Sequence, residues 1–106
     1  MNVTYPTALV LEAIAAGVHH GFDIMDATGL PSGSVYPILR RLEQEGLVRS
    51  RWEKHEIAQR EGRPPRRYYE IERAGAAWLE TARGRFRLLA ETVARPRRLK
   101  PARAEG

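Results

Sequence analysis

The spacing of apolar residues changes at Gly46, and this change limits the fold more than any other feature of the chain. Before Gly46, apolar residues recur at i, i+3, i+4 and i+7, which is the pattern of one buried face of a helix. The residues of this pattern are Val35, Ile38, Leu39 and Leu42. After Gly46, polar and apolar residues alternate from Val48 to Trp52, which is typical of a strand. The sequence therefore predicts a helix that leads directly into a β-strand.

A second alternating segment, Tyr68 to Ile71, predicts the partner strand of a β-hairpin. The connection from His55 to Arg67 is polar and basic, and it contains Gly62, Pro64 and Pro65. These residues interrupt strands because glycine has no side chain to pack and proline has no amide proton. We therefore expect a projecting loop, and residues His55–Arg67 are called the wing below.

Two further helices are expected before the third one. Between Thr7 and Ala16 the apolar residues recur at i, i+1, i+4 and i+5, and Gly17 ends this pattern. A shorter helix is indicated between Gly21 and Gly29, because the Leu30-Pro31 pair that follows is typical of a helix end.

Pro37 limits where the third helix begins. Proline has no amide proton and clashes with the carbonyl group four residues earlier, so it is best tolerated in the first turn of a helix. We therefore expect Pro37 in the first turn, with the N-cap at Ser32, Gly33 or Ser34.

The segment from Arg73 to about Arg95 carries apolar residues spaced by 3, 4, 3 and 4, the heptad pattern of a coiled-coil-like helix. These residues are Leu79, Ala82, Phe86, Leu89 and Val93. Two heptads are too few for an isolated coiled coil, and this stripe is the expected interface of the homodimer that the family resemblance described below implies. The tail after this helix has prolines and basic residues with little apolar content, and it is expected to be disordered.

These elements define the expected organisation of the chain. Residues 1–72 would form a winged-helix DNA-binding domain, residues 73–95 a C-terminal dimerisation helix and residues 96–106 a disordered basic tail. The predicted fold class is mostly α with a small β-hairpin, a winged helix-turn-helix plus the dimerisation helix. In this order of elements the third helix enters the major groove of DNA.

Charge is distributed unevenly along the chain. The net charge is +5, yet no Lys or Arg precedes Arg40, so the first 39 residues carry −3 and the rest +8. We expect a polyanion, most simply nucleic acid, to face the second part of the chain, because phosphates attract cations at long range. An arginine-rich proteome would produce the same excess, since the chain has 16 Arg and only 2 Lys.

The third helix and the hairpin carry the residues expected to contact DNA. The N-terminus of the helix offers free amides and a positive dipole end to a phosphate, and the arginines reach guanine edges or phosphates. The expected DNA-binding residues are Ser32, Ser34, Tyr36, Pro37, Arg40, Arg41, Arg49, Arg51, Arg63, Arg66 and Arg67. In the alternative interpretation, Tyr36 packs against a neighbouring helix and the arginines form a solvated face, with Glu43 and Glu45 beside Arg40 and Arg41.

Three runs are distinctive in their order and spacing: HGFDI, SGSVYPILRRLEQEGLV and GRPPRRYYEIERAG. They closely resemble the PadR family of bacterial transcriptional regulators, from Gly21 to Gly75, and the length resembles the short subfamily with one C-terminal helix. The resemblance implies a dimeric winged-helix repressor that binds a palindromic operator and whose last helix crosses to the partner subunit. One departure is Glu72, where the family often has Thr, which leaves the start of the last helix uncertain by a residue or two.

Some proteins of the family that this chain resembles bind hydrophobic or phenolic effectors between their final helices. Trp78 and Phe86 lie where such aromatic rings would line an effector pore. We prefer the simpler interpretation that both rings pack the dimer core, because burial alone explains Phe at a heptad position.

Other chemistries find little support in the sequence. His19, His20 and Asp23 are close in sequence, but Gly21 interrupts their helix and no further ligand cluster follows, so no metal is expected. There is no cysteine, glycine-rich phosphate loop or catalytic triad, so we expect neither a cofactor nor enzyme activity. Without a long apolar run or a secretory signal, the expected location is the cytoplasm, with no membrane partner.

Two other function classes stay open. The arginines could meet an acidic protein, in which case binding would not depend on DNA sequence. A nonspecific DNA-binding or RNA-binding role would keep the salt dependence of phosphate contacts and lose any operator preference.

Overall fold

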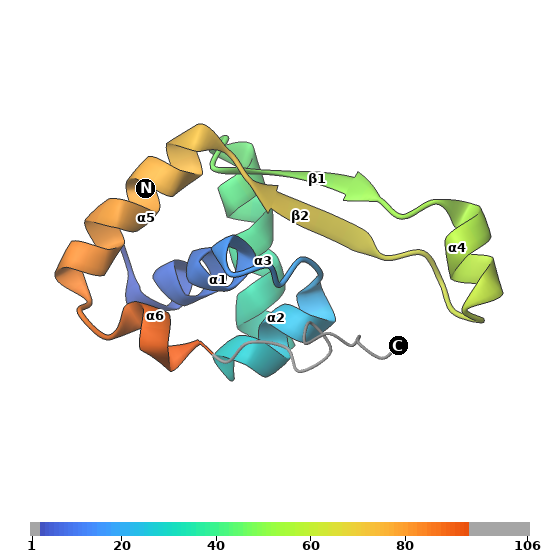
Figure 1. Cartoon of the computed structure of the whole chain (residues 1–106), viewed down its shortest axis with the longest axis horizontal. Coiled ribbons are helices and arrows are strands. Elements are labelled where there is room, and N and C mark those ends of the chain that lie inside the picture. Colours follow the sequence, from blue (N-terminus) through green and yellow to red (C-terminus); the bar gives the residue numbers. More distant parts are fainter. Residues whose placement is uncertain (1–2, 94–106) are drawn as a thin grey trace, which may run out of the picture.

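The computed structural model describes residues 3–93 of the chain. Its elements are α1 (Tyr5–Ala15), α2 (Gly21–Thr28), α3 (Ser32–Gln44), β1 (Val48–Trp52), α4 (His55–Arg60), β2 (Arg67–Ile71), α5 (Arg73–Arg85) and α6 (Leu89–Thr92). Figure 1 shows α1 near the centre, with α2 and α3 on one side of it and α5 and α6 on the other. The helices and the one antiparallel strand pair confirm the predicted fold class.

The first helix, α1, forms the centre of the hydrophobic core. All residues from Thr7 to Ile14 are buried, and α1 contacts α2, α3, α5, α6 and β2. A helix that is apolar around most of its circumference is stable only in an interior. It begins at Tyr5, two residues before the expected start, because the hydroxyl oxygen of Thr4 caps it by accepting the amide proton of Thr7 at 3.4 Å.

The next two helices confirm the predicted helix-turn-helix. α2 ends where Gly29 adopts a left-handed conformation with φ 76°, which glycine reaches without steric cost. Val35, Leu39 and Leu42 of α3 are each 0% exposed, as the helical pattern predicted.

The expected position of Pro37 in the first turn is wrong. α3 begins at Ser32 with Pro31 as its N-cap residue, so Pro37 is the sixth residue of the helix. The carbonyl group that meets the proline ring belongs to Gly33, and a glycine lets the backbone adjust more freely than any other residue would. The carbonyl oxygen of Pro31 starts the helix by accepting two amide protons at 2.9 and 3.0 Å.

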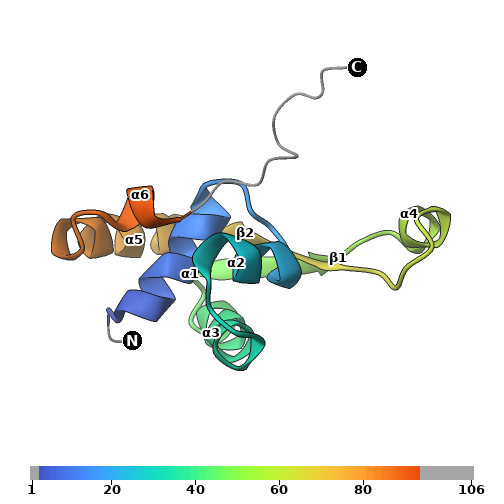
Figure 2. The same ribbon diagram turned by 90° about the horizontal axis from the view of Figure 1, so that it is seen from below.

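The two strands form the predicted hairpin, in a register that ends with Trp52 opposite Arg67. The segment before α2 lies along the other edge of β2, where the amide of Tyr69 donates to the carbonyl of His19 at 2.8 Å. The hairpin is thus anchored to the helices along its inner edge and projects away from them at its outer end (Figures 1 and 2).

The wing contains a helix that the sequence did not predict. Its first six residues form α4, so the expectation of a loop throughout the wing is wrong there. Six residues are too few to show a helical period in the sequence. In the structure, Ala58 of this helix is buried, and Gly62 adopts a left-handed conformation just after the helix ends. In both views α4 lies at the far end of the molecule from α5.

The C-terminal segment folds into two helices, so the expected single helix over residues 73–95 is wrong. α5 ends at Arg85, Phe86 has an extended backbone with φ −116° and ψ 90°, and the chain turns back into α6. Gly84 weakens the last turn of α5, since glycine costs about 1 kcal/mol relative to alanine within a helix. The turn allows α6 to pack on α1.

This turn changes what the heptad stripe contacts. Four of its residues are buried in the core of their own chain, and Phe86 packs against that core while partly exposed. The four are Leu79, Ala82, Leu89 and Val93. Heptad spacing indicates only that one side of a helix is apolar, and it cannot distinguish a partner's helix from the chain's own core. Residues 94–106, which include the predicted tail, lie outside the described part of the chain.

Candidate nucleic-acid interface

The outer side of α3 presents five of the eleven residues predicted to contact DNA. The exposed ones are Ser32, Tyr36, Pro37, Arg40 and Arg41, while Ser34 is half-buried. Ser32, Tyr36 and Arg40 are four residues apart and therefore form one row along the helix. Figure 2 shows α3 projecting from the body of the molecule, so this row faces outward along a protruding helix.

Tyr36 is held against α2. A Cβ atom built on Gly21 would lie 2.5 Å from the Tyr36 ring and 2.6 Å from its hydroxyl oxygen, so the ring occupies the space that any other residue at position 21 would need. Even so, 43% of Tyr36 stays exposed. Tyr36 therefore packs on a neighbouring helix, as one interpretation expected, and it also keeps the outward exposure that a DNA contact would require.

Arg67 connects the hairpin to α3. Its Nε donates to the hydroxyl of Ser50 at 2.9 Å, and its guanidinium lies 3.6 Å from the carboxylate of Glu43. Ser50 in turn donates to Glu43 at 2.7 Å. Glu43 is thereby engaged by the hairpin, which leaves Arg40 pointing outward on the neighbouring turn of α3.

Arg63 closes the base of the wing. Its guanidinium donates two hydrogen bonds to the carboxylate of Glu53, at 2.6 and 3.0 Å. Glu53 also accepts the backbone amide of Arg66 at 3.2 Å and the hydroxyl of Tyr68 at 3.3 Å. Chiefly because of Arg63, the pKa of Glu53 falls from 4.5 to about 2, and the same pairing raises the pKa of Arg63. This geometry favours a structural role for Arg63 over direct contact with DNA.

Arg49 and Arg51 lie on the side of the hairpin that faces away from α3, because strand residues alternate and Ser50 faces α3. Arg49 pairs with Glu70 at 2.7 Å, and Arg51 lies over the ring of Tyr68, 5.3 Å from its centre. The structure does not bring these two predicted residues together with the α3 row.

Two adjoining depressions lie between α3 and the hairpin. One encloses about 580 Å³ and is lined by Tyr36 and by residues 63–67, among others. The other encloses about 230 Å³ and is lined by Tyr36, Arg40, Glu43, Arg67 and Tyr69. Tyr36 and Arg67 line both depressions. The two depressions therefore form one concave surface, which we call the α3–hairpin groove. Its cations suit a phosphate backbone.

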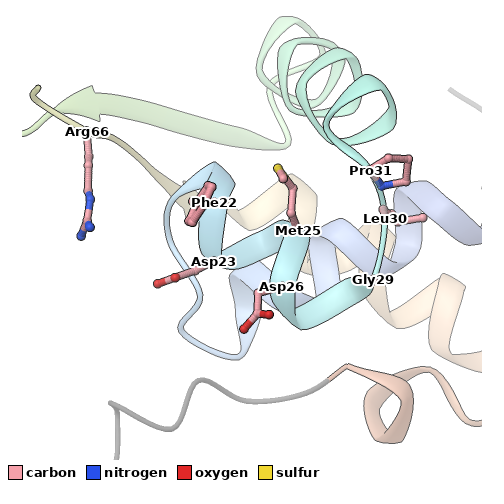
Figure 3. Close-up of a pocket in the computed structure, with 8 residues that line it drawn as sticks. All are labelled: Phe22, Asp23, Met25, Asp26, Gly29, Leu30, Pro31 and Arg66. Carbon is pink, nitrogen blue, oxygen red and sulfur yellow. The ribbon is translucent and has the colours of Figure 1, made fainter.

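A further cavity of about 850 Å³ lies beside α2 and shares Phe22 and Arg66 with the larger depression (Figure 3). Its lining residues are Phe22, Asp23, Met25, Asp26, Gly29, Leu30, Pro31 and Arg66. Asp23 also pairs with His20 at 2.9 Å. The two carboxylates repel phosphate groups, so this cavity is not suited to a DNA backbone.

The two residues predicted to line an effector pore lie elsewhere. Trp78 and Phe86 are partly buried against the core, and the ring of Phe86 meets that of Tyr5 edge to face at 5.2 Å. The indole Nε1 of Trp78 is buried and has no hydrogen-bond partner among the described residues. Neither residue lines the cavity in Figure 3.

Three residues of this region were not predicted from the sequence as site residues. Gly21 positions Tyr36, Glu53 holds Arg63, and Trp52 is 61% exposed beside Arg67. The strand alternation that places Ser50 toward α3 also places Trp52 on that side, so this signal was present. No sequence signal could pair Glu53 with a residue ten positions away across an irregular turn.

Within residues 3–93, no three His, Asp or Glu side chains gather in a metal-binding arrangement. None of the helices in that same range combines the length and the apolar character that a membrane span requires.

Comparison with solved structures shows the same fold in known regulators. A PadR family transcription regulator from hypervirulent Clostridium difficile is 20% identical, with a TM-score of 0.67 over 83% of this chain and 93% of that one. A PadR family transcriptional regulator from Eggerthella lenta is 22% identical, with a TM-score of 0.58 over 80% and 76% of the two chains. A PadR-like transcription factor from Bacteroides fragilis is 24% identical, with a TM-score of 0.55 over 77% and 84%.

Comparison of sequences identifies the family. No curated protein sequence matches the chain at a significant level. Residues 10–81 match the sequence model described as the transcriptional regulator PadR-like family, and this range includes α2, α3 and the whole hairpin. The chain therefore belongs to the PadR-like family and is a DNA-binding transcriptional regulator.

Proposed function

We propose that the protein represses transcription as a homodimer that binds a palindromic operator through the α3–hairpin groove. The observation that carries this proposal is the outward row of Tyr36 and Arg40 on a projecting helix, next to Arg67 on the hairpin. An aromatic hydroxyl and a guanidinium on one side of a helix suit base edges in the major groove, and the neighbouring cation suits a phosphate.

The dimer is needed because one α3 covers only a single half-site. A two-fold symmetric protein places two such helices in successive major grooves, about 34 Å or 10 base pairs apart. In the folded-back arrangement of α5 and α6, a partner would meet the outer apolar side chains of Tyr5, Phe86 and Leu88, of which Leu88 is 66% exposed. The predicted heptad interface would instead require α6 to leave α1.

Light scattering of purified Leu88→Glu separates these two arrangements. A charge at an exposed residue leaves the fold of one chain intact, so this variant becomes monomeric if Leu88 is covered by the partner. If Leu88→Glu stays dimeric, the partner does not cover Leu88, and the heptad interface is favoured. A wild-type protein that is monomeric while bound to its duplex would contradict the homodimer.

The DNA-binding surface is tested by footprinting on the DNA upstream of the protein's own coding sequence. We expect two protected half-sites one helical turn apart for the wild type, and loss of protection for Arg40→Ala. Arg73→Ala is the matched control, because Arg73 is an exposed arginine at the start of α5 that lines neither depression of the groove. Equal protection by Arg40→Ala and the control would contradict the proposed surface.

A hydrophobic or phenolic effector would bind at the α5–α6 end and act by changing the angle between the two subunits. The buried Nε1–H of Trp78, which lacks a partner among the described residues, is a donor that such a ligand could satisfy. Titration with simple phenols, followed by Trp78 fluorescence in a Trp52→Phe background, tests this idea. An unchanged signal together with unchanged DNA affinity would argue against it.

A further inference from the structure

The last residue of β1, Trp52, is unusually exposed for its type. It is 61% exposed, although tryptophan is usually well covered in a folded chain and exposed large aromatic rings often mark contact sites. The ring contributes little to the stability of the chain at this exposure. It is therefore free to contribute to binding.

Trp52 lies on the same side of the hairpin as the α3–hairpin groove. It is the cross-strand neighbour of Arg67, and the guanidinium carbon of Arg67 lies 5.1 Å from the centre of the indole ring. The same guanidinium reaches Ser50 and Glu43, which ties it to α3. Arg67 therefore connects Trp52 to the part of the groove that Arg40 and Glu43 line.

On this surface the cationic side chain of Arg67 lies beside the apolar ring of Trp52. Phosphate and deoxyribose are covalently linked and alternate along a DNA strand, so a cation beside an aromatic ring matches one phosphate and its neighbouring sugar. A protein partner would also need acidic groups to meet Arg40 and Arg67, whereas DNA supplies them in every nucleotide.

We propose that Trp52 is a DNA-contact residue, whose indole ring packs against a deoxyribose flanking the half-site while Arg67 binds the adjacent phosphate. This inference rests on the proposed function, because it extends the same groove. It adds an aromatic ring to the arginines that the sequence predicted as the DNA contacts of the hairpin.

The test measures affinity for the protein's own upstream duplex and for a scrambled duplex across a salt series, with Trp52→Ala, Trp52→Phe and Arg67→Ala. Trp52→Ala should weaken binding about tenfold at every salt concentration without changing the salt slope, because an apolar contact releases no counterions. Arg67→Ala should weaken binding and also lower the salt slope by roughly one. Trp52→Phe should recover most of the affinity.

Fluorescence gives a second measurement that leaves Trp52 itself unchanged. The chain has two tryptophans, so in Trp78→Phe the emission reports Trp52 alone, and it should change when the duplex is added. Wild-type affinity in Trp52→Ala, or an emission that stays constant through saturation, would overturn the proposal and leave a protein partner as the remaining explanation for the exposed ring.

The failure of the proposed function would look different. If the wild type binds both duplexes equally, the protein has no operator preference and the proposed function fails. The proposed contact of Trp52 with a deoxyribose would not be affected by this result, because every DNA sequence has the same sugar. The affinity ratio of Trp52→Ala to wild type on either duplex would therefore still decide the role of Trp52.

Discussion

The ring of Tyr36 in α3 lies directly against the backbone of Gly21 in α2, so that a Cβ atom at position 21 would fall 2.5 Å from the ring. The residue proposed to contact bases is thus positioned by a glycine of the preceding helix. The absence of a side chain at Gly21 is what allows α2 and the Tyr36 ring to approach so closely.

Replacing Gly21 by Ala should move the Tyr36 ring without unfolding the protein, because the ring is the far end of a partly exposed side chain that can rotate. We expect DNA affinity to fall about tenfold, within the range for loss of one good base contact. A titration with the upstream duplex checks this, and Gly21→Ala should cause no further loss in a Tyr36→Ala background. Additive losses would contradict the positioning role.

Replacing Gly75 by Ala should destabilise the whole domain. The new Cβ would fall on the backbone carbonyl oxygen of Leu47, and backbone cannot rotate away as a side chain can. We expect a loss of about 1–3 kcal/mol in the free energy of unfolding, as for overpacked cores. Urea denaturation measures this loss.

Gly84→Ala is the matched control for both glycine variants. No atom lies within 4 Å of a Cβ built there, and the residue is helical. Alanine should stabilise α5 by roughly 0.5–1 kcal/mol and leave DNA affinity unchanged. A destabilised Gly84→Ala would show that the turn at Phe86 depends on this glycine.

The wing should open in acid. The pKa of Glu53 is about 2 in the folded protein and 4.5 without its partners, so its ionised carboxylate stabilises the wing above pH 4.5. This contribution is lost as the pH falls from 4.5 toward 2. The emission of Trp52 in Trp78→Phe should report the change, and Glu53→Gln should remove it. A Glu53→Gln variant with the same acid transition would show that other groups control it.

Breaking the ion pair between α1 and α5 should loosen the C-terminal segment. Arg83 donates two hydrogen bonds of 2.9 Å to the buried carboxylate of Glu12, which raises the pKa of Arg83. Arg83→Ala leaves that carboxylate buried and unpaired, and because Arg83 itself is 40% exposed we expect a cost of only about 2 kcal/mol.

Glu80→Ala is the control for Arg83→Ala, since Glu80 meets the same guanidinium from an exposed position on α5. Its loss should cost less than about 0.5 kcal/mol, as for other exposed ion pairs. Equal costs for the two variants in urea denaturation would contradict the importance of Glu12.

Local signals in the sequence predicted the elements that position the site. The helical stripe before Gly46 reflects burial, since Val35, Leu39 and Leu42 are fully buried and Ile38 is partly buried. Glycine and proline marked the ends of α2 and of the hairpin because their backbone preferences are local.

What the sequence could not predict depends on contacts between distant residues. The turn at Phe86 depends on the packing of α6 against α1, and the position of Arg63 depends on its hydrogen bonds to Glu53 across the base of the wing. The exposure of Trp52 follows from where α3 ends relative to the hairpin. No periodicity contains this information, because it arises only when the elements pack together.

The most direct test of the central claim is a titration of the purified protein with its own upstream duplex and with a scrambled duplex of equal length, at two salt concentrations. An operator-binding regulator should prefer the upstream duplex by at least roughly a hundredfold, and both affinities should fall as salt rises. Equal affinity for both duplexes would contradict operator recognition by the α3–hairpin groove, and no binding to either would point to an acidic protein as its partner.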